Sequence, residues 1–437
     1  MAGRLRRSAE GLVLRPPNVP DRPDGLSGAY HTLAMPALDT PPLALYVHLP
    51  WCVRKCPYCD FNSYTLNGEL PAETYLARLV RDIESQGPQV SGREVTSVFF
   101  GGGTPSLFPP ETIGRVLEAA HRHLRVALDV EVTLEANPGA IERGAFREYR
   151  AAGVTRVSLG AQSFDARALH SLGRIHSPED TQRAAAELHA ADLSNFNLDL
   201  MYGLPGQEPA GAVRDIEQAL GLAPAHLSHY QLTLEPGTMF AARPPPLPDE
   251  DECAAMLEQC RGRLSTAGFA QYEVSAYARE GARCRHNLNY WSFGDYLGVG
   301  AGAHGKLTFA AVARIVRTTQ LREPRRYLAA PDTALAERTI PPQDLPFEFM
   351  LNALRLTAGF ERTTFTTRTG LAWEAIAGVV RAAVEAGLLV STAKGCRPSG
   401  RGLRFLNDLL LYFLPETPEK SGASALSMAT PEVGTSP

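Results

Sequence analysis

The chain has 437 residues, enough for about two or three domains of roughly 150 residues each. Hydrophobic residues make up 44% and charged residues 21%, which excludes a chain that is disordered throughout. The formal net charge is −4, so no strongly positive field exists and nucleic acid is not expected as a partner. No apolar run approaches the ~18 residues of a membrane span. The seven cysteines, an odd number, argue against a disulfide framework.

The two ends of the chain have biased compositions. Residues 1–42 are rich in Arg and Pro and lack the apolar core of a secretory signal, and Met35 is an alternative start. Residues 416–437 are rich in Ser, Pro, Thr and Ala. We expect a disordered extension at each end, and a cytoplasmic protein.

Short apolar strands alternate with amphipathic helices between these ends. The expected strands are Leu43–Leu49, Ser97–Phe100, Val130–Glu135, Arg156–Ser163, Asn195–Tyr202 and His226–Glu235. The expected helices include Ala72–Ser85, Pro110–His123 and Pro178–Ala190. A parallel crossover needs about a dozen residues, so these repeats predict an α/β fold with a parallel sheet.

Four of the strands have one apolar and one polar face, as Leu45 and Val47 against Tyr46 and His48 illustrate. Helices must cover the apolar faces, so the polar faces are expected to line a wet or ligand-filled interior. Six strand–helix units favour a partial, TIM-like (βα)6 barrel over residues 43–270. A doubly wound open sheet and a solvated antiparallel sheet are the structural alternatives. In such barrels the chemistry sits at the C-terminal strand ends.

The pattern changes after about residue 270. Residues 271–340 are expected to close the barrel, and within them Tyr272–Leu307, rich in Gly, Tyr and His, is expected to be irregular. Residues 341–415 are expected to form a small, mostly helical, winged-helix-like C-terminal domain. Its elements would be helices at Phe347–Leu356, Ala372–Ala386 and Gly402–Phe413, with a short strand at Leu388–Ser391.

Three cysteines follow the first strand with the spacing C-x3-C-x2-C: Cys52, Cys56 and Cys59. Three thiolates in one tight loop suit an iron–sulfur cluster. Structural zinc is the alternative, and it requires four ligands, for which His48 is the nearest candidate. The other four cysteines are scattered and are interpreted as ordinary buried thiols. The spacing favours the cluster.

A run of glycines, Phe99-Phe100-Gly101-Gly102-Gly103-Thr104, follows the second strand. It lacks the last glycine of a dinucleotide fingerprint. Consecutive glycines let a ligand approach the backbone closely, although an ordinary tight turn has the same composition.

The motif C-x3-C-x-Tyr-C at the end of a first strand resembles the signature of the radical S-adenosylmethionine (SAM) family. The resemblance implies the partial barrel and a [4Fe-4S] cluster held by the three cysteines. It also implies that SAM is chelated by the open iron and is cleaved to a 5′-deoxyadenosyl radical. The glycine run resembles the family's methionine-binding motif.

Further motifs resemble the branch of oxygen-independent coproporphyrinogen III oxidase-like proteins, from about residue 43 to 414. The resemblance implies that SAM contacts the following residues: Tyr46, Gly102, Gly103, Thr104, Glu135, Gln162, Arg174 and Asp199. Carboxylates accept from ribose hydroxyls and arginine pairs with a carboxylate, so these roles are chemically reasonable. A polar group that is satisfied inside the barrel is the alternative for each residue taken alone.

Two subfamilies of this branch compete. The oxidase carries a further cysteine two residues after the third cluster ligand, where this chain has Phe61, and no substrate-covering N-terminal motif is evident. The HemW haem chaperones carry His-Asn-x-x-Tyr-Trp, found here as residues 286–291. The resemblance therefore favours a haem chaperone, with the porphyrin oxidase as the alternative; a non-catalytic binding protein shares the same features.

His286 is the expected haem ligand, flanked by aromatic rings that could stack on a porphyrin. Cys284 and His304 are alternative ligands, and a core histidine is the alternative role for His286. Haem binding should weaken as the pH falls through about 6.5, the ordinary histidine pKa. Implied partners are haem and client haemoproteins such as respiratory enzymes. Peripheral membrane contact through clients and a homodimer are left open.

Overall fold

The computed structural model describes residues 37–139, 145–330 and 335–415. The tail at residues 416–437 and residues 1–36 of the expected N-terminal extension lie outside the described residues. Residues 37–42 are ordered: the Asp39 N–H donates to the Thr367 carbonyl at 2.9 Å, and the Pro42 carbonyl accepts from the Asp295 N–H at 3.0 Å. These two hydrogen bonds join residues 37–42 of the expected extension to the rest of the described chain.

A 12-stranded sheet forms the body of the molecule, in the order β14-β13-β12-β11-β1-β4-β5-β6-β7-β8-β10-β9. Its last two strands are β10 (Ala276–Ala278) and β9 (Ala270–Gln271). The six expected strands lie side by side and parallel in its centre. They are β1 (Leu43–Leu49), β4 (Glu94–Gly102), β5 (Arg125–Ala136), β6 (Arg156–Gln162), β7 (Phe196–Tyr202) and β8 (His226–Gln231). The partial barrel is thus confirmed, with β4 and β5 longer and β7 and β8 shorter than predicted.

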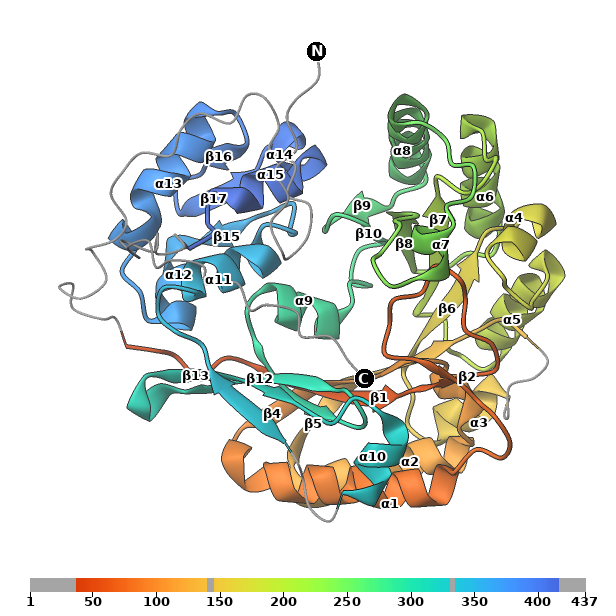
Figure 1. Ribbon diagram of the computed structural model, residues 1–437, viewed down its shortest axis with the longest axis horizontal. Helices are drawn as coiled ribbons and strands as arrows, with labels where there is room; N and C mark the ends of the chain where they lie inside the picture. Colours follow the sequence, from red (N-terminus) through yellow and green to blue (C-terminus); the bar gives the residue numbers. More distant parts are fainter. Residues whose placement is uncertain (1–36, 140–144, 331–334, 416–437) are drawn as a thin grey trace, which may run out of the picture.

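Crossover helices cover the outer face of the curved sheet (Figure 1). The principal ones are α1 (Ala72–Gln86), α2 (Pro110–His123), α5 (Pro178–Ala190), α6 (Pro209–Gly221) and α8 (Glu250–Thr266), with the shorter α3 (Phe146–Ala151) and α4 (Ala166–Ser171) between them. Proline at the first position starts α2, α5 and α6, where its missing N–H costs nothing. Apolar side chains on the inner faces of these helices pack with the strands into one large core.

Residues 271–340 are more regular than predicted. They contain α9 (Arg285–Trp291), β11 (Asp295–Val299), β12 (His304–Phe309), β13 (Arg314–Thr319), α10 (Pro324–Ala329) and β14 (Ala336–Thr339). The first of these strands, β11, pairs in parallel with β1, and the others extend the sheet antiparallel. The expectation of irregular structure was wrong because β11, with all five residues buried, shows no alternating pattern.

The C-terminal residues pack around a second apolar core. It is built from α11 (Leu345–Ala353), α12 (Arg362–Thr369), α13 (Glu374–Glu385), α14 (Gly400–Arg404) and α15 (Leu406–Leu411). A small sheet joins them, in the order β15 (Phe360–Glu361), β17 (Gly395–Pro398), β16 (Leu389–Ser391). Helix α12 was not predicted, and the expected helix Gly402–Phe413 is broken at Phe405. The mostly helical character agrees with the prediction. The division into domains at residues 270, 340 and 415 stays a prediction.

Helix α9 lies on the face of the sheet opposite α1 and α2, between the C-terminal helices and the barrel strands (Figure 1). It contacts β4, β1 and β11. This helix carries the His-Asn-x-x-Tyr-Trp motif, so the fold itself brings that motif to the barrel interior. Among the described residues, no helix is long and apolar enough to cross a membrane.

Candidate functional site

The three cysteines lie in the loop between β2 (Trp51–Cys52) and β3 (Tyr64–Thr65), which pair in parallel and close the loop at its base. All three are free thiols and partly exposed. The Lys55 ammonium donates to the carbonyls of Phe61 and Ser63, at 3.1 and 3.0 Å, and so holds the loop together. We call Cys52, Cys56 and Cys59 the cluster cysteines.

The cluster cysteines influence one another electrostatically. Burial raises the pKa of Cys52 and of Cys59, and the neighbouring thiols of the loop raise both further. Three crowded thiolates are unfavourable without a compensating cation, and ligation of iron supplies one by displacing the thiol protons. The donor set and its placement therefore fit an iron–sulfur cluster with cysteine ligands.

The geometry does not favour zinc. Within the part of the chain that the structure describes, no group of three or more His, Cys, Asp or Glu side chains is arranged to hold a metal ion. A [4Fe-4S] cluster places a different iron atom at each cysteine, so its ligands need not converge on one point. His48 is also engaged elsewhere: Nδ1 lies 2.9 Å from the Tyr46 hydroxyl and Nε2 lies 2.9 Å from the Asn62 carbonyl.

The glycine run packs the end of β4 onto the base of the cysteine loop. Gly102 has φ +121°, and a Cβ there would lie 2.6 Å from the His48 ring. A Cβ at Gly103 would lie 2.6 Å from the Trp51 carbonyl oxygen. Close backbone approach therefore explains both glycines before any ligand is considered.

The N–H groups of Gly102, Gly103 and Thr104 are used within the protein. Gly102 donates to Glu135 Oε2 at 3.1 Å, Gly103 to the Leu49 carbonyl at 2.8 Å, and Thr104 to the Trp51 carbonyl at 2.8 Å. The backbone of these three residues can therefore serve a ligand as an acceptor rather than as a donor, which suits an ammonium group such as that of methionine.

The carboxylates at the strand ends lie in the barrel interior and feel each other's charge. Burial, followed by the charge of Asp199, raises the pKa of Glu135 to about 7. Burial also raises the pKa of Asp199, which accepts from Ser158 Oγ at 3.1 Å and from Asn197 Nδ2 at 2.8 Å. Around Asp199 the interior is therefore filled with hydrogen-bonded side chains.

Two cavities divide the predicted SAM residues. A cavity of about 840 Å³ is lined by Tyr46, Gly102 and Glu135 and also by His286; we call it the large cavity. A smaller one of about 190 Å³ is lined by Cys56, Thr104 and Arg174.

The remaining predicted SAM residues line neither cavity. Gln162, which has φ +67°, accepts from the Tyr230 hydroxyl at 2.7 Å, and Asp199 lies in the hydrogen-bonded network already described. Arg174 donates to the Gly160 carbonyl at 2.7 Å and contacts Cys56 Sγ at 3.7 Å. The structure thus brings Arg174 to the cysteine loop and Glu135 to the large cavity.

His286 lies at the inner wall of the large cavity, on α9. Its Nδ1 is 3.3 Å from Ser97 Oγ, and its ring centroid is 4.9 Å from that of Phe99. Nε2 makes no hydrogen bond within the described residues, which leaves it available to a metal in the cavity. Asn287, Tyr290 and Trp291 line the same cavity.

Burial lowers the pKa of His286 to about 3. The imidazole is therefore neutral across the physiological range, as ligation requires. The expectation that haem binding weakens near pH 6.5 assumed the ordinary histidine pKa, and for a ring that is only 7% exposed we expect this decrease at lower pH instead.

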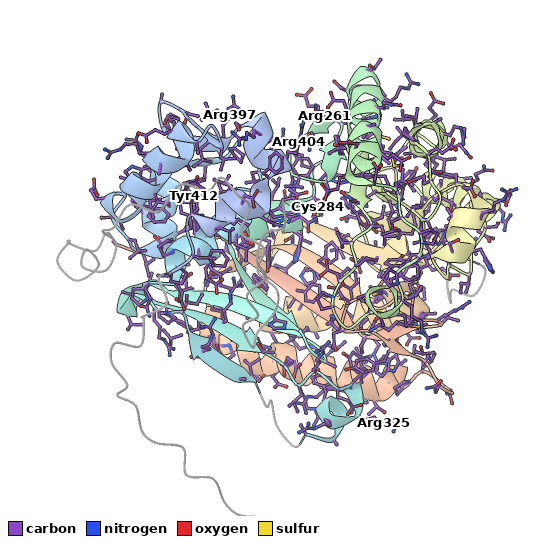
Figure 2. The ribbon with its side chains drawn as sticks, turned by 45° about the horizontal axis from the view of Figure 1, so that its top comes forward. Arg261, Cys284, Arg325, Arg397, Arg404 and Tyr412 are labelled. Carbon is purple, nitrogen blue, oxygen red and sulfur yellow. The ribbon has the colours of Figure 1, made fainter. Side chains whose placement is uncertain are left out.

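The alternative ligands are less well placed. Cys284 is buried and does not line the large cavity; its thiol donates to Glu131 at 3.6 Å, and burial raises its pKa to about 11. Figure 2 shows Cys284 in the interior, beside the sheet. His304 lines the cavity at its exposed edge, with Nδ1 3.3 Å from Thr319 Oγ1.

Several residues of the large cavity were not predicted: Asn62, Phe99, Tyr296, Gln320 and Arg322. Asn62 lies in the cysteine loop, three residues after Cys59. This closeness in sequence is the one local feature that could have predicted it. The others come from strands and loops that only the fold brings together.

Comparisons with known proteins identify the family of the chain. Residues 46–219 match the model of the radical SAM superfamily, and residues 340–405 match the HemN C-terminal domain. The chain is 47% identical to the haem chaperone HemW of Escherichia coli over 381 residues, 86% of this chain and 99% of that protein. It is 37% identical to the bovine mitochondrial radical S-adenosyl methionine domain-containing protein 1, over 88% and 90% of the two chains.

The solved structure of Escherichia coli coproporphyrinogen III oxidase, described as a radical SAM enzyme, superposes with a TM-score of 0.72 at 22% identity, over 86% of this chain and 90% of that one. At this identity the likeness concerns the fold alone. Superfamily membership implies a [4Fe-4S] cluster and SAM as cofactors, and the cluster cysteines are suited to hold the former. On these matches and this geometry, the chain belongs to the HemW family of haem chaperones within the radical SAM superfamily.

Proposed function

We propose that this protein binds haem in the large cavity, with His286 Nε2 as the iron ligand, and delivers it to client haemoproteins. The observation that carries the proposal is the large cavity itself. It joins a buried, neutral imidazole and the aromatic side chains of α9 to Gly102 and Glu135 of the predicted SAM site. Relatives that are named haem chaperones and match nearly end to end support the same function.

The cluster cysteines would hold the [4Fe-4S] cluster, which supplies an open iron site for the amino and carboxylate groups of SAM. We further propose that Tyr46, Gly102 and Glu135 contact SAM from the large cavity, and that Thr104 and Arg174 contact it from the smaller one. Gln162 and Asp199 would act at the strand ends, and Gly103 would act beside Gly102 in the glycine run. The role proposed for Glu135 requires that its carboxyl group be ionised when SAM is bound. Only the ionised group offers both oxygens as hydrogen-bond acceptors.

Decarboxylation of coproporphyrinogen III is the second candidate function. Against it, Phe61 stands where the oxidase branch carries its further cysteine, and this side chain lines the large cavity with 61% exposure. A phenyl ring cannot transfer a proton or bind iron. We therefore assign the cavity to binding rather than to porphyrin oxidation.

We propose a cytoplasmic protein whose clients include respiratory haemoproteins. A homodimer, contact with membranes through clients, and the domain boundaries at residues 43, 270, 340 and 415 belong to the same proposal.

Haem titration of anaerobically reconstituted protein, followed by absorption, tests the function. His286→Ala should weaken haem binding at least about tenfold, equivalent to 1.4 kcal/mol, or change the haem spectrum. His121→Ala, at an exposed position on α2, is the matched control and should bind as the wild type does. Iron and sulfide contents should be equal in all three proteins, because neither histidine is a cluster ligand.

Two results would contradict the proposal. One is haem binding that is indifferent to His286. The other is conversion of coproporphyrinogen III to protoporphyrinogen IX by the reconstituted protein, which would indicate a porphyrin oxidase instead.

A further inference from the structure

The large cavity contains very few charged groups. Among the described residues that line it, Arg322 is the only Arg or Lys and Glu135 is the only Asp or Glu. Glu135 lies beside Gly102, at the SAM site. Arg322 is exposed and follows β13, so it lies at an open edge of the cavity. An anionic group of a bound molecule therefore has one cationic side chain to meet.

Arg322 is held in place by the cysteine loop. Its Nε donates to Asn62 Oδ1 at 3.0 Å, and its backbone carbonyl accepts from Asn62 Nδ2, also at 3.0 Å. The Tyr64 hydroxyl donates to the same carbonyl at 3.3 Å. Since both Arg322 and its backbone are bound to Asn62, the guanidinium is oriented before any ligand arrives.

The outer edge of this guanidinium is available. Its two Nη groups form no hydrogen bond or ion pair within the described residues. The adjacent acid, Glu323, is engaged on its own helix, where its carboxylate accepts from the N–H groups of Arg325 and Arg326 at 3.0 and 2.8 Å. Nothing acidic in the described surroundings thus neutralises Arg322.

The edge of the cavity has a positive potential. His304, which also lines the cavity, has its pKa lowered by burial and then by the charges of Arg317 and Arg322. Arg317 is paired with Glu348, whereas Arg322 has no such partner among the described residues. The charge of Arg322 is therefore not neutralised by a described acid, and it can attract a carboxylate to this edge of the cavity.

We infer that Arg322 pairs with a peripheral carboxylate of the bound porphyrin and so selects porphyrins that carry free propionate groups. The inference rests on the proposed function and deepens it. With the iron near His286 at the inner wall, the propionates of haem would reach the open edge where Arg322 lies. The guanidinium edge matches a carboxylate in shape as well as charge, and the pair would fix which side of the ring faces outward.

Asn62 would act as a positioning residue for this contact. It orients Arg322, and its own carbonyl lies 2.9 Å from His48 Nε2. Since Asn62 belongs to the cysteine loop, three residues after Cys59, disorder of that loop should also loosen Arg322.

The test compares haem with haem dimethyl ester, in which both propionates are neutral, by absorption titration of the full-length, anaerobically reconstituted protein. The wild type should bind haem about three- to tenfold more tightly than the ester, the range for an ion pair at a partly exposed site. Arg322→Ala should lower haem affinity to about that of the ester and leave ester affinity unchanged. The wild-type preference should also shrink as salt is raised.

Arg325→Ala is the matched control, because Arg325 projects from α10 at the edge of the molecule (Figure 2) and does not line the cavity. It should keep the full preference, and Asn62→Ala should lose part of it. Equal cluster content in all variants excludes misfolding as the cause. Haem binding without a preference over the ester, or a preference that survives Arg322→Ala, overturns the inference alone. A wild type that binds neither porphyrin overturns the proposed function, and this inference with it.

Discussion

The Glu131 carboxylate fixes the helix that carries His286 to the barrel. Glu131 lies on β5 and is 7% exposed. Its Oε1 accepts from the N–H of Arg285 at 2.8 Å and from the N–H of His286 at 3.2 Å. The Cys284 thiol donates to the same oxygen at 3.6 Å. One carboxylate oxygen thus satisfies the first turn of α9 and sets the position of the imidazole.

The cost of removing this oxygen follows from those contacts. Glu131→Ala leaves two backbone donors without an acceptor, and each unsatisfied buried donor costs about 1–3 kcal/mol. The Arg285 N–H is only partly buried, so we expect about 2–4 kcal/mol in total rather than the full sum. Glu131→Gln keeps an acceptor and loses only the charge at the helix N-terminus, which is worth about 0.3–1 kcal/mol.

Urea unfolding and haem titration measure the two consequences. The free energy of unfolding should fall in the order wild type, Glu131→Gln, Glu131→Ala. Haem affinity should fall in the same order. Each loss of 1.4 kcal/mol in the free energy that holds α9 on the barrel should lower the affinity by up to about tenfold.

Asp129→Ala is the matched control, because Asp129 pairs with the side chain of the same Arg285 but is 78% exposed. Its loss should cost much less stability than the loss of Glu131, because a solvent-exposed ion pair contributes little. Equal unfolding midpoints and equal haem affinities for Glu131→Ala and Asp129→Ala would refute the idea that the buried carboxylate positions α9.

Three further predictions concern the cofactors and pH. Serine at any cluster cysteine should abolish the iron and sulfide content of anaerobic protein, whereas Cys253→Ser should not; stoichiometric zinc in the wild type would contradict this. SAM should bind more tightly as the pH rises through about 7, where Glu135 loses its proton, and Glu135→Gln should flatten this dependence; a wild-type affinity that is constant from pH 6 to 8 would speak against a role for the carboxylate. Haem affinity should stay constant between pH 5 and 8, since His286 gains its proton only near pH 3, and a decrease centred near 6.5 would indicate another ligand.

The barrel strands and their helices are well predicted by local pattern. The bounds of β1, α2 and α5 agree with the sequence expectation at both ends, because alternating faces, first-turn prolines and capping residues are local signals. The strand β11 and the helix α9 could not be found in this way. All five residues of β11 are buried against β1, some 250 positions earlier in the chain, so no polar face marks the strand.

The residues of the site were likewise predictable from the sequence only where the relevant pattern is local. The cluster cysteines and the aromatic histidine motif each occupy a short stretch of sequence, so spacing indicates the first and the family resemblance indicates the second. The partners that orient them are distant in the sequence: Glu131 lies on β5 and Arg322 follows β13, and each meets its partner only through the fold. The pKa of His286 likewise depends on burial against Phe99 and Tyr46, which composition cannot express.

The central claim concerns where haem iron lies, and an iron anomalous difference map of anaerobic crystals loaded with SAM and haem tests it most directly. We expect one strong group of peaks at the cluster cysteines and a separate single peak in the large cavity, within bonding distance of His286 Nε2. A haem iron outside the large cavity would contradict the account, for example in a third cavity, of about 520 Å³, that is lined by Trp291 and Phe349.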